Sequence, residues 1–134
     1  MKNRISTFFF ILIVSLSIGC KSSFETVRTS NDPPTILKAA NKYYDEEDYR
    51  KAQTLYELII PFYRGKAEAE DLFYRYTYTY YHQDQYIFAS HYFDNFTKTF
   101  YNSTKKEEMA FMSAYSNYLM SPNFKLDQKP SDLA

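Results

Sequence analysis

The sequence predicts an all-α protein built from repeated pairs of antiparallel helices. Three observations carry this prediction. Residue types recur at a fixed step of 37 residues, which is long enough for two helices and their turns. Helix-capping residues stand at the starts of several segments expected to be helical. The chain has only two glycines, Gly19 and Gly65, too few for a turn-rich β fold or a glycine-rich phosphate loop.

The repeat appears in small residues and in tyrosines. Ala40, Thr77 and Ala114 follow one another at the step of 37 residues. The same step relates these further residues: Tyr43 and Tyr80; Tyr44, Tyr81 and Tyr118; Tyr49 and Tyr86; Ala52 and Ala89. The segments 43–52 and 80–89 therefore match, and each resembles the turn between the two helices of a tetratricopeptide repeat, whose period is about 34 residues. The resemblance implies a superhelix of antiparallel helix pairs, with about two and a half repeats.

Capping signals and the repeat register predict five helices. Asp32 and Asp48 are expected to cap the first and second helices, and Gly65 lies just beyond the end of the second. The predicted helices span 34–45, 49–63, 66–82 and 86–101, and a fifth runs from a capping box at 104–107 to about residue 121. Residues 74–80 alternate in the manner of a strand, but the register places them in the third helix.

The register also bears on the end of the chain. It places the next alanine of the series at Leu126, yet an alanine follows only at Ala134. We therefore expect the repeat domain to span 32–134 and to be truncated in its third repeat, where the second helix begins.

The first nineteen residues have the features of a secretory signal peptide. Lys2 and Arg4 give a positive start, and an apolar stretch follows over residues 8–18. This stretch is shorter than the roughly 18–20 apolar residues that a membrane-spanning helix needs, and Ser15 and Ser17 interrupt it. The segment 1–19 is therefore interpreted as a cleaved signal peptide.

Gly19 followed by Cys20 resembles the lipobox of bacterial lipoproteins, although Ser17 stands where leucine is usual. The resemblance implies that Cys20 becomes the mature N-terminus and carries acyl chains, with no other cofactor. Each buried CH₂ contributes about 0.8 kcal/mol, so several chains anchor a protein stably. Residues 20–31 are then the lipidated cysteine and a polar tether. Lys21 stands where an inner-membrane retention signal would have Asp, and the acidic run that marks surface-exported lipoproteins of some Bacteroidetes does not follow Cys20. The resemblance therefore implies the periplasmic face of the outer membrane.

No residue pattern supports catalysis, a metal site or nucleic-acid binding. Cys20 is the only cysteine, and the two histidines, His82 and His91, have no metal-ligand spacing with Asp84. Removing Lys2 and Arg4 from the 16 basic residues leaves 14 against 16 acidic residues, so the mature chain has a net charge of −2. That balance does not suggest nucleic acid as a partner. We expect a protein that is not an enzyme.

An anchor at Cys20 followed by tetratricopeptide-type repeats resembles outer-membrane assembly lipoproteins of the BamD family, Bacteroidetes type. The segments that carry the resemblance are 73–81, 95–100, 112–115, 121–122 and 126–128. The resemblance implies a protein of the β-barrel assembly machinery that binds unfolded outer-membrane proteins. It also implies a BamA-like barrel subunit as partner, held through C-terminal repeats that this chain lacks. The alternative is a SusD-like nutrient-binding lipoprotein, against which the absence of tryptophan counts.

The first helix of each tetratricopeptide pair lines the concave face. The register therefore predicts a partner-binding face that consists of these residues: Tyr44, Tyr74, Tyr78, Tyr81, Phe111, Tyr115 and Tyr118. The step of 37 pairs Tyr78 with Tyr115 and Tyr81 with Tyr118. Arg75, beside this face, is the candidate to pair with a peptide carboxylate. The alternative for each ring is ordinary packing between helices.

We predict that Cys20 is acylated at the mature N-terminus, because the residues before it resemble a lipobox. Mass spectrometry of the N-terminal peptide should show a chain that begins at Cys20 with added acyl groups. A peptide that continues unbroken through Gly19 and Cys20 would contradict the prediction.

Overall fold

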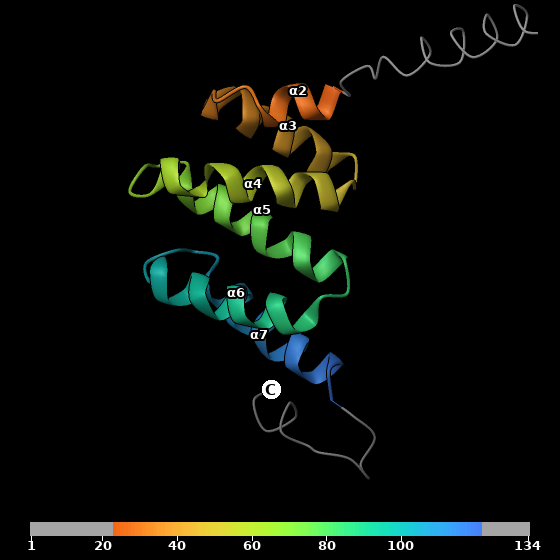
Figure 1. The fold of residues 1–134 in the computed structure, drawn as a ribbon. Helices are drawn as coiled ribbons and strands as arrows, with labels where there is room; N and C mark the ends of the chain where they lie inside the picture. The colour runs from red at the N-terminus through yellow and green to blue at the C-terminus, as the bar shows by residue number, and fades with distance from the viewer. Residues whose placement is uncertain (1–22, 122–134) are drawn as a thin grey trace, which may run out of the picture.

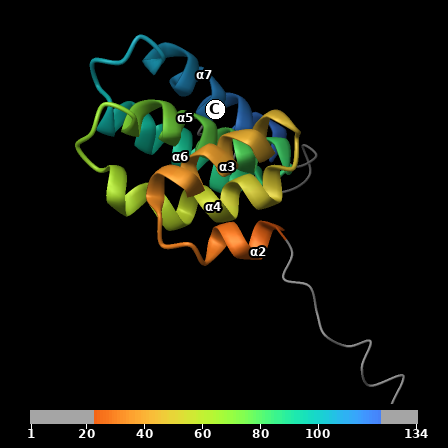
Figure 2. The same ribbon diagram turned by 90° about the horizontal axis from the view of Figure 1, so that it is seen from above.

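The computed structural model describes residues 23–121, and within that range the chain forms six α-helices and no strand. They are α2 (Ser23–Arg28), α3 (Pro33–Asp45), α4 (Tyr49–Tyr63), α5 (Ala69–His82), α6 (Tyr86–Thr99) and α7 (Lys106–Leu119). Consecutive helices pack on one another, with α2 and α7 at opposite ends of the stack (Figure 1; Figure 2). The prediction of an all-helical chain is confirmed for this range. The signal peptide, Cys20 and Leu126 lie outside the described residues.

Helix α2 occupies part of the segment that the sequence predicts to be a polar tether. Its residues Phe24 and Val27 pack against the core, and the Phe24 ring lies 5.8 Å from the ring of Tyr43. Glu25 and Arg28 form an exposed ion pair one turn apart, at 2.7 Å. Two apolar residues at helical spacing are thus enough to hold this short segment against α3. No helix within residues 23–121 has both the length and the apolar character needed to cross a membrane.

Two predicted caps are confirmed, and a third is wrong. The side chain of Asp32 accepts a hydrogen bond from the Thr35 N–H, and Asp48 accepts one from the Lys51 N–H, each at 3.3 Å. No side chain caps the first turn of α7, so the capping box predicted at Thr104 is absent. The hydroxyl of Ser103 accepts the N–H of Lys105 instead, at 3.0 Å.

Ser103 also makes a tertiary contact. Its hydroxyl donates to Glu70 of α5 at 2.7 Å, which fixes the loop before α7 against that helix. Helix α5 itself begins at Ala69, three residues later than predicted, because Gly65 has a φ of 76° and the chain turns there before the helix can start.

The turns after α3 and α5 have the same backbone structure at the step of 37 residues. Glu47 and Asp84 occupy the left-handed region, with φ of 61° and 57°. The N–H of Glu47 donates to the Tyr44 carbonyl at 3.0 Å, and the N–H of Asp84 donates to the Tyr81 carbonyl at 3.0 Å. The repeat seen in the sequence is therefore also a repeat of turn geometry.

The core forms where small residues let the helices come close. Ala40, Ala52, Ala89 and Thr77 are fully buried, and each stands at one of the repeated positions. Larger side chains fill the space around them; the largest that are fully buried include Tyr56, Phe93, Phe96, Leu55 and Ile59. Truncating a large buried side chain in such a core lowers the free energy of unfolding by about 2–5 kcal/mol, because a cavity remains.

The positive φ of Glu47 gives a prediction about stability. A left-handed conformation destabilises the folded state by about 1–2 kcal/mol when the residue is not glycine. Glycine removes this strain, but its greater freedom in the unfolded chain offsets part of the gain in stability. Glu47→Gly should therefore raise the free energy of unfolding by about 0.5–1 kcal/mol in urea titrations. The matched control is Glu46→Gly in the same turn, where φ is −86° and glycine should destabilise. Equal effects of the two substitutions would contradict the strain at Glu47.

Candidate functional site

Aromatic rings of α3, α5 and α7, with one from the start of α4, form a continuous band. We call this set the aromatic band: Tyr44, Tyr49, Tyr74, Tyr78, Tyr81, His82, Phe111, Tyr115 and Tyr118. It contains all seven partner-binding residues predicted from the sequence, together with Tyr49 and His82. The band takes shape because α5 carries Tyr74, Tyr78 and Tyr81 at helical spacing, so their side chains share one face.

The centre of the band is the imidazole of His82. Its ring stacks on Tyr49 at 4.3 Å and lies 6.3 Å from Tyr44 and 5.9 Å from Tyr78. Burial lowers the pKa of His82, so the ring is neutral at pH 7. From the sequence, His82 was considered only as a metal ligand. Its spacing of four residues from Tyr78 was the signal that the two rings share a helix face.

One ring contact joins α5 to α7 in the band, and it differs in register from the prediction. The Tyr81 ring lies 6.4 Å from that of Tyr115, whereas the step of 37 pairs Tyr81 with Tyr118. Positions 37 residues apart lie opposite each other only when the two helices run parallel and are not shifted along their axes. Tertiary packing sets both the crossing angle and this shift. The seven predicted rings therefore lie together in one band, but the predicted pairing of Tyr81 with Tyr118 is wrong.

The α7 end of the band is the most open to solvent. Phe111 is 65% exposed and Tyr118 is 63% exposed, while Tyr115 between them is 37% exposed. The three rings stack along the helix, with centroids 5.9 Å apart for Phe111 and Tyr115 and 6.1 Å apart for Tyr115 and Tyr118. All three side chains are therefore exposed within the described residues.

The α5 tyrosines are partly structural. Tyr78 packs against the buried Phe93, with ring centroids 5.1 Å apart, and its hydroxyl donates to Glu108 of α7 at 2.5 Å. The Tyr74 hydroxyl donates to the same carboxylate oxygen at 2.9 Å. Burial, followed by this hydrogen bond, raises the pKa of both phenols. Tyr74 and Tyr78 therefore pack between helices and also form part of the aromatic band.

The basic residues beside the band already have acidic partners. Arg75 donates to Asp45 at 2.7 Å, and its guanidinium lies over the Tyr44 ring at 5.1 Å. Lys105 pairs with Asp71 and lies 4.9 Å above the Tyr74 ring. A hollow of about 420 Å³ lies between these two cations, with Asn41 on its wall. A ligand carboxylate at Arg75 would therefore have to compete with Asp45, which is 64% exposed.

The chemistry of the band suits binding. Its exposed groups are aromatic rings and phenol hydroxyls, which offer apolar area and hydrogen bonds. Within residues 23–121, no group of three His, Cys, Asp or Glu side chains is arranged to hold a metal ion.

Tyrosine ionisation should make the fold sensitive to alkali. Burial raises the pKa of Tyr44 to about 12. The unfolded chain loses phenolic protons near pH 10, so between about pH 10 and 12 it binds fewer protons than the native state and stability falls as pH rises. Urea unfolding should show a lower free energy at about pH 11 than at about pH 9, and Tyr44→Phe should reduce the difference. Equal stability at the two pH values would contradict this assignment.

Comparison with known proteins adds no identification. No family model matches the chain, and no curated protein matches it. The function therefore has to be inferred from the aromatic band and from the sequence features that accompany it.

Proposed function

We propose that this protein is a non-catalytic, lipid-anchored outer-membrane lipoprotein of the β-barrel assembly machinery, which binds segments of unfolded outer-membrane proteins. The observation that carries the proposal is the open stack of Phe111, Tyr115 and Tyr118 on α7, continuous with the rings of α5. A row of large exposed apolar side chains on a soluble domain marks an interaction surface.

A tetratricopeptide-type architecture is part of the same proposal. It is supported by the turn repeated at Glu47 and Asp84, and by the buried small residues Ala40, Ala52, Thr77 and Ala89 at the register positions. Solenoids of this kind present first helices side by side and bind extended peptides along them. Helices α3, α5 and α7 are the first helices of successive pairs, and together they carry nearly all of the band.

An unfolded outer-membrane protein offers a ligand of suitable chemistry. Its strands alternate apolar and polar residues, so an extended segment presents aromatic or aliphatic side chains at every second position. Those side chains would lie against the rings of Phe111 and Tyr115, while tyrosine hydroxyls hydrogen-bond the peptide backbone. The acyl chains expected on Cys20 would hold this face near the membrane, and the BamA-like subunit would bind elsewhere.

The exposed rings of α7 give the test. A synthetic peptide of about ten residues, the length of one membrane-spanning strand, with alternating apolar residues and a terminal Phe, is titrated against the protein. Phe111→Ala and Tyr118→Ala together should weaken its binding more than tenfold, since truncating a hot-spot residue typically costs about 2 kcal/mol or more. Both side chains are exposed, so circular dichroism should show unchanged helicity.

The matched control is Phe62→Ala, which removes a ring that is 58% exposed on α4, outside the band. This variant should bind the peptide as the unaltered protein does. Unchanged affinity in the α7 double variant would refute the proposed site. A different outcome would favour the SusD-like alternative. In that case the unaltered protein would bind a soluble oligosaccharide but not the peptide, and the α7 double variant would lose the oligosaccharide binding.

A further inference from the structure

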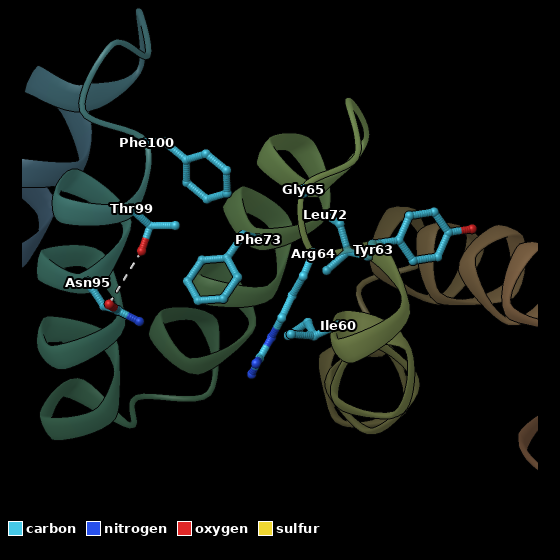
Figure 3. A pocket seen from close by; sticks show the side chains of 10 residues that line it. Ile60, Tyr63, Arg64, Gly65, Leu72, Phe73, Asn95, Thr99 and Phe100 are labelled. Atoms are coloured by element: carbon cyan, nitrogen blue, oxygen red, sulfur yellow. Dashed lines mark hydrogen bonds between the residues drawn. The ribbon is translucent and has the colours of Figure 1, made fainter.

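A second site lies away from the aromatic band and shares no residue with it. A cavity of about 310 Å³ opens where the C-terminal ends of α4 and α6 meet the first half of α5 (Figure 3). Its apolar walls consist of Ile60, Tyr63, Ala69, Leu72, Phe73 and Phe100. The volume is at the lower end of the range of about 300–1,000 Å³ that small-molecule pockets have.

The polar groups of this cavity offer hydrogen-bond donors. Figure 3 shows the Arg64 side chain lying in the gap between Phe73 and Ile60. Within residues 23–121, Arg64 makes no ion pair and no hydrogen bond through its guanidinium. On the opposite wall, the Thr99 hydroxyl donates to the Asn95 amide oxygen at 3.5 Å, which leaves the amide N–H groups of Asn95 for another acceptor.

Among the described residues, none that lines the cavity carries a carboxylate. Glu57 stands two turns before Arg64 on α4, about 10 Å along the helix. Its carboxylate is engaged there, because the hydroxyl of Tyr80 donates to it at 2.9 Å and the amide of Gln53 donates at 3.0 Å. The cavity thus presents an unpaired guanidinium and an amide donor around an apolar interior. A guanidinium is best matched by a carboxylate, which it binds through two parallel hydrogen bonds.

We propose that this cavity binds a small carboxylic acid with an apolar body, of the medium-chain fatty-acid class. The carboxylate is held by the guanidinium of Arg64 and the amide of Asn95. The hydrocarbon chain lies against Leu72, Phe73 and Phe100. The limited volume suits one chain and not a two-chain phospholipid. The site is independent of the peptide-binding face, so either proposal can fail without the other.

The test uses decanoate and its uncharged counterpart decanol, titrated into the folded protein by calorimetry. Decanoate should bind more tightly than decanol. Arg64→Gln should weaken decanoate binding about tenfold or more and leave decanol unchanged, because charge-assisted hydrogen bonds to the carboxylate are lost. Arg50→Gln, an exposed arginine of the same helix outside the cavity, is the matched control and should have no effect.

A second variant keeps the test independent of Arg64. Thr99→Asp places a carboxylate at the exposed rim and should weaken binding of decanoate but not of decanol. Equal binding of the two ligands by the unaltered protein, no binding of either, or unchanged decanoate affinity in Arg64→Gln would overturn the proposal. An N-acetylated dipeptide ending in Phe that displaces decanoate and binds more tightly would also overturn it, in favour of a peptide C-terminus as the occupant.

Discussion

Close approach of neighbouring helices at small buried side chains determines the rest of this structure. Ala40 of α3, Ala52 of α4 and Ala89 of α6 have no exposed surface, and Thr77 takes the equivalent place on α5. A larger residue at any of these positions would force the helices apart or strain the side chains around it. Aromatic residues around these positions gather in two places, the aromatic band and the walls of the cavity between α4, α5 and α6.

Helix α5 contributes residues to both the aromatic band and the cavity. Its aromatic residues are mostly tyrosine, and their hydroxyls reach carboxylates on the neighbouring helices. Tyr74 and Tyr78 donate to Glu108 on the side of the band. Tyr80 donates to Glu57 on the other side. A phenol fills space between helices as phenylalanine does, while its hydroxyl reaches a carboxylate at the edge of the core. Since a hydrogen bond to a charged group contributes about 1.5–3 kcal/mol, these pairs help fix α5 against α4 and α7.

The two sides differ in charge as well as in shape. Along the band, the cations Arg75 and Lys105 are paired with Asp45 and Asp71, and His82 is neutral, so the surface is aromatic with little free charge. At the cavity, Arg64 has no ion-pair partner within residues 23–121. The band therefore suits a long, largely uncharged segment, and the cavity suits a small anion with an apolar body. The stack thus presents two surfaces of different chemistry.

The sequence by itself determined five of the six described helices, α3 to α7, with most of their boundaries, and seven of the nine residues of the aromatic band; it did not predict α2. These follow from local rules: Asp32 and Asp48 cap the helices that follow them, and side chains three and four residues apart share a face. The tertiary structure alone decided that Ser103 bonds Glu70 of α5, that Tyr81 meets Tyr115, and that His82 lies at the centre of the band. The tertiary structure also places Arg64 and Asn95 on the walls of one cavity, although they are far apart in the sequence. Such contacts depend on the offset and crossing of helices, which packing of the whole core sets and no local pattern encodes.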